Sequence, residues 1–407
     1  MRLKYAAPAR EERLQTKPAE ALYVALENVE SWSGRLLLDH PMDVVEGGVT
    51  RFRTGDVLVG KLRPYLAKVA RPTFDGVCST EFVVLRPTSR LLAEFLQYQL
   101  LTAEFIGEMS SWTFGTKMPR VSPERMLKTE VMLPSIEEQR AIVGFLDEQI
   151  SRVNKVIEGN WHLLELVDEQ RRRLVLDAIT KGVGQHHELQ NSGVAWIGEI
   201  PATWNLRRIK QVARLASGHT PSRSHPEYGL DAQVPWFQLT DIWRFRDDSE
   251  ESIFETAEMI SEVGLRNSAA ELLPQGTEAL SRTASVGFSA ILGVDMATTQ
   301  DFANWVPGPL VDSAYLLYAL RAMRPEFERL RFGSTHKTIY MPDISQLVMP
   351  LPPLEEQKRI VHHIRAECSR LLQARERLRQ TVEKLKKYRS ALITAAVTGE
   401  IDVRGAA

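Results

Sequence analysis

The feature that most constrains the fold of this 407-residue chain is an internal repeat. The segment LPSIEEQRAIV begins at Leu133, and LPPLEEQKRIV begins at Leu351, 218 positions later; seven of the eleven positions are identical. Fainter likenesses flank these segments: Gly115 falls opposite Gly333, and AITKG, ending at Gly182, falls near AAVTG, ending at Gly399. A repeat of this length predicts two similar halves, each a variable domain followed by a long helix.

Two shorter likenesses lie inside the variable parts. The segments TRFRTGDVLVGKLR, from Thr50, and ELLPQGTEALSRTA, from Glu271, both place a turn glycine before a short apolar run. Residues 26–29 (LENV) likewise resemble residues 239–242 (LTDI). Both likenesses extend the duplication into the domains.

The repeated segments open two long amphipathic helices, because their apolar residues recur in steps of three and four. The first helix carries Ile142, Leu146, Ile150, Val153, Ile157, Trp161, Leu164 and Val167; the second carries Ile360, Ile364, Cys368, Leu371, Leu378, Val382, Leu385 and Leu392. Ser135 and Glu138 have the spacing of a capping box, and Gly182 and Gly399 are natural helix stops. Each helix is therefore expected to run about 45 residues, or about 65 Å.

Helices of this length need a partner for the apolar stripe, and the nearest partner is the other copy. We therefore predict an α+β fold in which two α/β domains are separated by two long antiparallel helices that form a coiled coil. The alternative is that each helix packs only on its own domain. The expected core of the helix pair is Ile142, Leu146, Ile150, Val153, Ile157, Leu164, Ile360, Ile364, Leu371, Leu378, Val382 and Leu385.

The predicted boundaries follow from the repeat. Residues 1–132 form the first variable domain, 133–183 the first long helix, and 184–350 the second variable domain with a linker at 184–205. The second long helix takes residues 351–399, and 400–407 form a tail.

The charge is balanced in total but uneven along the chain. The net charge is −1, yet five basic residues and no acidic one lie between Pro201 and Pro226, and six basic residues face a single acid between Arg51 and Arg71. Basic stretches of this kind suit nucleic-acid phosphates, although ordinary solvated surface charge is the alternative.

Motifs for catalysis or metal binding are not evident. GDVLVGKL, from Gly55, has the GxxxxGK spacing of a phosphate loop, but Leu62 stands where a hydroxyl is needed, and Val57–Val59 resemble a strand. The two cysteines, Cys78 and Cys368, are too few for a cysteine zinc site or a disulfide framework. We expect no catalytic site, no metal site and no cofactor in this chain.

No apolar run approaches the ~20 residues that span a bilayer, and the charged start, MRLKYAAPAREERL, lacks an apolar signal core. The expected location is the cytoplasm, without membrane contact.

The segments LPPLEEQKRIV and LITAAVTGEI, the earlier LPSIEEQRAIV, and WIGEIPATWNLRRIK followed by LASGHTPSR resemble the specificity subunit of type I restriction–modification systems. The resemblance covers nearly the whole chain, although the first half has no clear counterpart of SGHTP. It implies that the two domains are target-recognition domains, each reading half of a split double-stranded DNA site. It also implies recruitment of two methyltransferase subunits and of motor–nuclease subunits, which would hold S-adenosylmethionine, ATP and magnesium.

Basic and hydroxyl residues in loops are the candidates for DNA contact, because Arg and Lys bind phosphates or guanine edges and hydroxyls bind phosphates. The candidates are Lys61, Arg63, Lys117 and Arg120 in the first domain, and Ser217, Thr220, Arg282, Thr283, Ser285, Lys337 and Tyr340 in the second. Two other classes stay open. One is a coiled-coil scaffold that never touches DNA, and the other is a nuclease with an unrecognised site.

Overall fold

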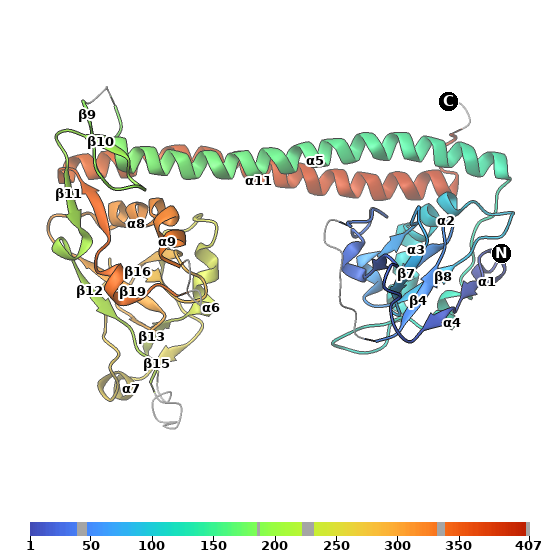
Figure 1. Cartoon of the computed structure of the whole chain (residues 1–407), viewed down its shortest axis with the longest axis horizontal. Helices are drawn as coiled ribbons and strands as arrows, with labels where there is room; N and C mark the ends of the chain where they lie inside the picture. The colour runs from blue at the N-terminus through green and yellow to red at the C-terminus, as the bar shows by residue number, and fades with distance from the viewer. Residues whose placement is uncertain (39–46, 185–187, 222–231, 332–337, 404–407) are drawn as a thin grey trace. The chain divides into compact units, whose positions relative to one another are not determined.

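A computed structural model describes residues 1–38, 47–184, 188–221, 232–331 and 338–403 (Figure 1). The chain divides into two compact units. Unit 1 comprises Met1–His162 and Leu378–Ala407, and unit 2 comprises Leu163–Arg377. Two long helices, α5 (Ile136–Lys181) and α11 (Leu354–Thr398), each contribute one part to each unit.

The globular part of unit 1 has short strands and helices. Its strands are β1 (Ala9–Arg10), β2 (Arg13–Leu14), β3 (Tyr23–Val24), β4 (Val49–Phe52), β5 (Val57–Gly60), β6 (Val69–Ala70), β7 (Gly76–Ser79) and β8 (Phe82–Leu85). Its helices are α1 (Leu3–Ala6), α2 (Ala93–Leu100), α3 (Ala103–Ser111) and α4 (Pro123–Met126), with 3-10 helices at Leu26–Asn28 and Pro64–Leu66.

The globular part of unit 2 is built from more strands. They are β9 (Leu189–Asn191), β10 (Glu199–Pro201), β11 (Asn205–Arg208), β12 (Ala213–Ser217), β13 (Val234–Phe237), β14 (Ser252–Ile253), β15 (Met259–Ile260), β16 (Glu278–Ser281), β17 (Ser289–Leu292), β18 (Ala297–Thr298), β19 (Phe302–Pro307) and β20 (Val348–Leu351). The helices are α6 (Leu239–Ile242), α7 (Glu262–Arg266), α8 (Ser313–Ala322), α9 (Arg324–Arg331) and α10 (Met341–Ile344), with 3-10 helices at Ile209–Gln211 and Trp243–Phe245.

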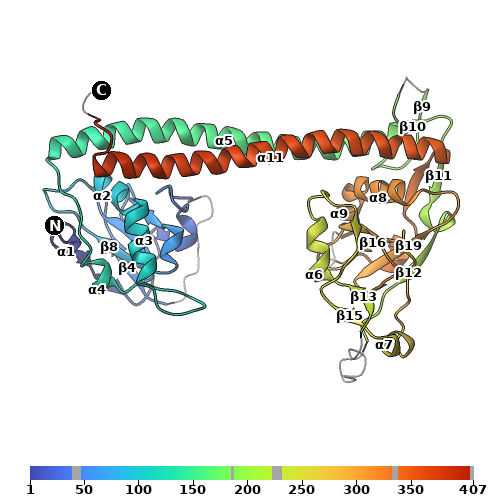
Figure 2. The same ribbon diagram turned by 180° about the vertical axis from the view of Figure 1, so that it is seen from behind.

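In unit 1, two four-stranded sheets, ordered β1-β8-β5-β6 and β2-β4-β7-β3, enclose a core that includes Phe52, Leu58 and Cys78. On the other side of the first sheet, α2 buries Phe95 and Leu96 in a second core that it shares with both long helices (Figure 2). The successive layers are therefore sheet, short helices and helix pair. Full burial of each such large apolar side chain contributes about 1.5–3 kcal/mol.

Unit 2 repeats this plan. A five-stranded sheet, ordered β12-β19-β16-β17-β14, packs against α8, whose Tyr315 and Leu316 are fully buried. α8 lies between this sheet and the long helices (Figure 1), and Ile179 of α5 and Ile360 of α11 join the same core. Each long helix is thus held by its partner and by the globular layer beneath it.

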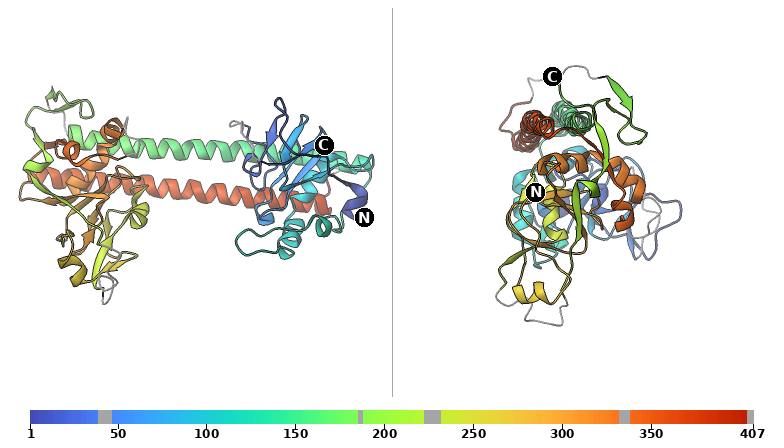
Figure 3. Two further views of the ribbon diagram at one scale, coloured as in Figure 1. Left: turned by 60° about the horizontal axis from the view of Figure 1, so that its bottom comes forward. Right: turned by 90° about the vertical axis from the view of Figure 1, so that its left-hand side faces the viewer.

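Within each unit the two long helices run side by side and antiparallel (Figure 3). In unit 1, Val153 and Ile157 of α5 pack against Val382 and Leu385 of α11. In unit 2, residues near the end of α5 share a core with residues near the start of α11. The predicted α+β class, with two mixed domains and two long antiparallel helices, is confirmed.

Most of the expected stripe is buried. Ile142, Leu146, Ile150, Val153, Ile157, Leu164, Ile360, Ile364 and Val382 are at most 8% exposed, whereas Leu371, Leu378 and Leu385 are half-buried. Trp161 follows the helical period but is not among the expected core residues; its side chain is 46% exposed, and Lys386 Nζ lies 5.5 Å from the ring centroid. An indole covered by a lysine stem is stable at a helix surface.

Two arginines are buried beside the apolar stripe, at the same position in the two copies. Arg171 is 6% exposed and Arg389 is 4% exposed. Arg389 Nη1 donates to Asn154 Oδ1 of α5 at 2.6 Å, and Arg171 donates to the carbonyl oxygen of Asp247. Burying a guanidinium is costly unless its protons find acceptors, so these two positions tolerate few other arrangements.

The helix ends follow the predicted signals. Glu138 N donates to Ser135 Oγ at 3.2 Å, and Ser135 N donates to the Glu138 carboxylate at 3.1 Å, which completes the capping box. Gly182 and Gly399 follow the last helical residues with φ of 76° and 78°, the left-handed conformation that ends helices.

The duplication reaches the start of the chain. Leu3 N donates to Thr129 O at 2.8 Å, and Ile209 N donates to Leu347 O at 2.9 Å. The segment Arg-Leu-Lys at residues 2–4 is therefore structurally equivalent to Arg-Ile-Lys at residues 208–210. β1 pairs with β8 as β12 pairs with β19, but β1 has two residues and β12 has five.

Candidate nucleic-acid interface

Each unit carries a basic residue directly after a central strand of its main sheet. Lys61 follows β5, and its N–H donates to Glu81 O at 2.8 Å. Arg282 follows β16, and its N–H donates to Asp301 O at 2.9 Å. The two side chains thus start from equivalent backbone positions, although only one is a lysine.

The next residues turn sharply in both units. Leu62 forms an isolated bridge with Arg120, and Thr283 forms one with Thr338, which stands 218 positions after Arg120. Arg63 then has a φ of 50° and Ala284 a φ of 56°, which is the left-handed region that bulky side chains rarely adopt. Such strain is kept where the surrounding structure imposes it, and the Arg63 side chain at this turn is exposed.

The turn of unit 1 packs against a second loop, which carries Lys117. Phe114 and Arg120 exchange backbone hydrogen bonds of 2.9 and 3.0 Å, so residues 115–119 project as a closed loop. Arg63 N donates to Pro119 O at 2.7 Å and joins the two segments. We call residues 61–65 and 114–120 the unit 1 basic loops; they bring together all four candidates of the first domain.

The four candidates differ in how free their charges are. Arg120 donates from Nε and Nη2 to the two carboxylate oxygens of Glu81, at 3.1 and 3.2 Å. The hydrogen bonds that Arg120 donates to Glu81 raise the pKa of Arg120. Because this guanidinium already has an acceptor, it fastens the loop, whereas Lys117 and Arg63 are exposed.

In unit 2, the candidates gather around Gln300. Thr220 Oγ1 donates to Gln300 Oε1 at 2.5 Å, and Arg282 Nε donates to Gln300 O at 3.0 Å. Arg282 Nη1 also lies 3.5 Å from Ile339 O, next to Tyr340, whose ring is 58% exposed. Residues 282–285, 300 and 339–340 are called the unit 2 basic loops below.

The remaining candidates of the second domain lie beside this group or outside the described residues. Ser285 N donates to Thr283 O at 2.6 Å and tightens the turn. Ser217 is the exposed last residue of β12, opposite Ala303 of β19. Lys337 and the glycine-led segment from Gly333 lie outside the described residues.

Sequence reasoning missed several side chains that the fold adds to these loops. Gln300 was not predicted as a site residue because a single glutamine belongs to no sequence motif. It is recognised only from its hydrogen bonds with Thr220 and Arg282. Phe114 and Tyr65 are 62% and 48% exposed on the unit 1 basic loops. Exposed apolar groups beside basic ones can contact thymine methyl groups, a signal that loop position alone does not reveal.

The globular part of unit 2 is joined to the long helices by ion pairs. Arg375 of α11 contacts Asp247 at 3.0 Å and Asp168 of α5 at 3.1 Å. Burial alone would raise the pKa of Asp247, but hydrogen bonds from Ser249 and Arg375 outweigh it and lower the pKa to about 2. The charged carboxylate of Asp247 therefore helps to hold the globular part of unit 2 on its helices at neutral pH.

The phosphate-loop-like segment and the two cysteines have structural positions in the described part of the chain. No group of three or more His, Cys, Asp or Glu in the described ranges is placed to hold a metal ion. Within the segment that has phosphate-loop spacing, Val57–Gly60 form strand β5. Both cysteines are buried, and burial raises the pKa of Cys78 to about 12. Among the described helices, none is long and apolar enough to cross a membrane.

Comparison with known proteins agrees with this arrangement. A family model described as "Type I restriction modification DNA specificity domain" matches residues 50–160 and 201–383, more than half of the chain. The "Type I restriction enzyme MjaIX specificity subunit" of Methanocaldococcus jannaschii is 31% identical over 170 residues, a match that spans 40% of this chain and only 38% of that protein.

Longer matches are weaker in identity. The "Putative type I restriction enzyme MjaX specificity subunit" of the same organism is 23% identical over 386 residues, covering 90% of this chain and 84% of that protein. A solved structure from a study of "complex assembly and conformational transition of the type I R-M system" has a TM-score of 0.73 at 21% identity, covering 98% of this chain and 97% of the other. That likeness shows a shared fold.

Proposed function

The chain belongs to the type I restriction–modification DNA specificity family, and from this premise we propose that it is a non-catalytic subunit that reads a split DNA target. The observation that carries the proposal is the equivalent placement of Lys61 and Arg282 after β5 and β16, each beside a strained turn and a second loop. Two equivalent basic loop groups suit two half-sites, one for each recognition domain.

Within each half-site, the side chains would divide between phosphates and bases. Lys117 and Arg63, which are exposed, suit phosphate oxygens or a guanine edge. Arg282 is anchored through Nε, so its orientation is set before DNA arrives. Anchored groups lose less conformational freedom on binding, which favours base readout over simple charge attraction.

The two long helices would set the number of unread base pairs between the half-sites. Paired helices with capped ends are stiff, so the interval should be constant for a given helix length. Half-sites one helical turn apart are about 34 Å apart along B-DNA.

The catalytic steps would belong to partner subunits. We propose two methyltransferase subunits, which hold S-adenosylmethionine, and motor–nuclease subunits, which hold ATP and magnesium. In this division of labour, the chain supplies sequence recognition and the partners supply methylation, translocation and cleavage.

The test is selection from a random DNA duplex library with the purified chain and its cognate methyltransferase. The expected result is enrichment of one split motif with a constant gap. A coiled-coil scaffold would enrich nothing, and that outcome would overturn the proposal. Cleavage by the isolated chain in magnesium would instead place it among nucleases.

A further inference from the structure

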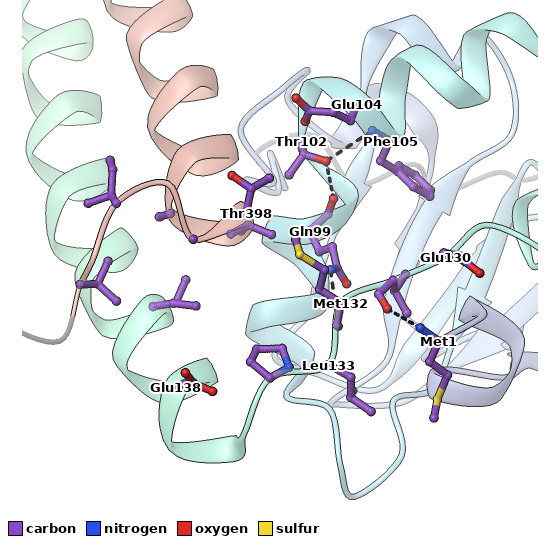
Figure 4. A pocket seen from close by; sticks show the side chains of 18 of the residues that line it. Met1, Gln99, Thr102, Glu104, Phe105, Glu130, Met132, Leu133, Glu138 and Thr398 are labelled. Carbon is purple, nitrogen blue, oxygen red and sulfur yellow. Dashed lines mark hydrogen bonds between the residues drawn. The ribbon is translucent and has the colours of Figure 1, made fainter.

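Two cavities of the chain have linings of opposite charge. Figure 4 shows the larger, of about 900 Å³, in unit 1, between the first turns of α5, the last turns of α11 and the start of α3. Carboxylates such as those of Glu104 and Glu138 line it, and its described lining includes no Lys or Arg. The smaller cavity, of about 30 Å³, lies in unit 2 and is lined by Arg171, Arg172 and Arg321. A volume of this size holds one water molecule or one monatomic ion.

The smaller cavity, called the arginine cavity below, lies where three helices of unit 2 meet. α5 contributes Arg171 and Arg172, α8 contributes Arg321, and α11 contributes Cys368. Asp248, from the loop between α6 and β14, supplies the carboxylate of the described lining. A group bound here would therefore touch the globular part of unit 2 and both long helices.

One guanidinium nitrogen at the arginine cavity has no acceptor. Arg171 is 6% exposed, and its Nη2 donates to the carbonyl oxygen of Asp247, whereas no described residue accepts from its buried Nη1. Arg321 donates to the carbonyl oxygens of Asp248 and Glu250, but its Nε, 3.4 Å from Asp248 Oδ1, makes no hydrogen bond. Leaving buried charged donors unpaired is costly, so an acceptor is expected beside them.

The acids around the arginine cavity are already paired with other arginines. The pairs are Asp248 with Arg324, Glu251 with Arg365, and Asp168 and Asp247 with Arg375, at 2.6–3.1 Å. Arg321 shares Asp248, whereas the described residues give Arg171 and Arg172 no carboxylate. Burial and the charges of these three arginines lower the pKa of Arg324, although Asp248 raises it. Positive charge is therefore in excess at the cavity.

The other two polar groups of the lining do not supply the missing negative charge. The Tyr318 hydroxyl donates to Glu251 at 2.6 Å, and burial raises the pKa of both Tyr318 and the Cys368 thiol. Both groups are therefore neutral at neutral pH. A water molecule in the cavity would need acceptors for its own hydrogens, whereas an anion only accepts, which suits a lining rich in guanidinium donors.

We propose that the arginine cavity binds one chloride ion, which accepts from Arg171 Nη1 and balances the charges of Arg172 and Arg321. The enclosed volume suits a monatomic anion and is too small for the phosphate groups of DNA. The bound ion would link α5 and α8 to the loop that carries Asp248. The seating of the globular part of unit 2 on the long helices would thus depend on chloride, which goes beyond the reading of DNA.

The internal repeat shows that the frame folds without these cations. In the alignment that the two repeated glutamines set, Leu101 of unit 1 takes the position of Arg321, and Ser390 takes that of Arg172. Leu101 is 1% exposed, so hydrocarbon fills its place. The buried arginine of unit 1, Arg389, therefore lacks the two neighbouring cations, and an anion site is expected in unit 2 only.

Bromide replaces chloride and can be located by anomalous diffraction. Crystals of the full chain in sodium bromide should show an anomalous peak in the arginine cavity beside Arg171. The peak should weaken in Arg172→Gln, whose side chain is exposed, and vanish in Arg321→Leu, which copies unit 1. Arg173→Gln, at the next position of α5 and outside the lining, is the matched control and should keep the full peak.

Hydrogen exchange gives the readout in solution. Replacing sodium gluconate by sodium chloride at constant ionic strength should slow exchange over residues 168–176 and 316–322, because opening of the cavity releases the ion. Above the dissociation constant, each tenfold rise in chloride should slow this exchange about tenfold, as one site requires. Arg321→Leu should remove the dependence, and residues 386–394, the counterpart in unit 1, should show none.

Three results would overturn the proposal. One is a water molecule in the cavity with no bromide peak. Another is equal exchange of residues 168–176 in chloride and in gluconate. The third is a peak that needs molar bromide and persists in Arg321→Leu, which would mark an adventitious ion only.

Discussion

Gln139 and Gln357 make the same hydrogen bonds in the two halves of the molecule, and both are fully buried. Gln139 Oε1 accepts from Leu92 N at 2.8 Å while its Nε2 donates to the carbonyls of Arg90 and Pro134. Gln357 Oε1 accepts from Asp312 N at 2.8 Å, and its Nε2 donates to Leu310 O and Pro352 O. The repeated EEQ segment therefore fastens the start of each long helix to the loop before α2 or α8.

Replacing Gln357 with leucine should loosen the start of α11. The substitution removes the partner of the Asp312 N–H and of the carbonyls of Leu310 and Pro352, and a buried group left without a partner costs about 1–3 kcal/mol. Peptide-resolved hydrogen exchange should show faster exchange over residues 354–364 and 310–316. Gln373→Leu, at an exposed position of the same helix, should leave that exchange unchanged; equal effects of the two variants would show that the amide network is unimportant.

Lys117→Ala should weaken DNA binding by removing a contact to phosphate. The slope of log affinity against log salt should become shallower by about 0.9, the value for one lost contact on B-DNA. Lys337→Ala is expected to act in the same way in the second domain. Lys128→Ala, exposed but outside the basic loops, serves as the control. Unchanged affinity and slope in both loop variants would remove these lysines from the interface.

Lengthening both long helices by four residues should change the gap in the recognised DNA and keep both half-sites. One helical turn adds about 6 Å at 1.5 Å per residue, which corresponds to about two base pairs. The insertions belong at matching positions of α5 and α11, so that the apolar steps of three and four are preserved. Mapping of methylated adenines in a host that carries the altered subunit would reveal the gap. A changed half-site sequence with a constant gap would contradict the assigned role of the helices.

The free energy of unfolding should fall in acid because the Asp247 carboxylate becomes protonated. The pKa of this carboxylate is lowered to about 2, so its contribution is present above the unfolded pKa of about 3.9. This stabilising contribution is lost as the pH falls through the pKa of Asp247 in the folded protein. Urea unfolding should show that Asp247→Asn is less stable than the parent chain at pH 6 and nearly equal to it at pH 2. Arg375→Gln should follow the same trend, because it removes the partner. A stability difference that is constant from pH 6 to pH 2 would contradict this origin.

The helices and their ends were predictable because their signals are local and repeated. The Ser135–Glu138 capping box, the stops at Gly182 and Gly399, and the turn glycines Gly55 and Gly276 are all where the sequence places them. Gly55 and Gly276 have φ of 89° and 87°, so a backbone requirement lies behind their match.

The features that escaped prediction depend on contacts between distant segments. The match of residues 2–4 with 208–210 is only three residues long, and its meaning emerges from the bonds to Thr129 and Leu347. Arg120 was predicted to contact DNA because of its charge. Its guanidinium instead donates hydrogen bonds to the carboxylate of Glu81, which lies 39 positions away in the sequence. Trp161 matched the helical period, and its exposure depends on which residues the neighbouring helix offers there.

The buried arginines of the long helices bear on how the chain finds its alignment as it folds. Aliphatic seams of similar residues are poor at distinguishing one stagger from the next, and slipping by a turn would cost them little. Arg389, however, has its acceptor at Asn154, and Arg171 has its acceptor at Asp247. A slipped helix pair would move Asn154 away from Arg389 and leave this buried guanidinium without that acceptor, at a cost of several kcal/mol. Staggers that separate these two residues are thereby disfavoured as the helices pair.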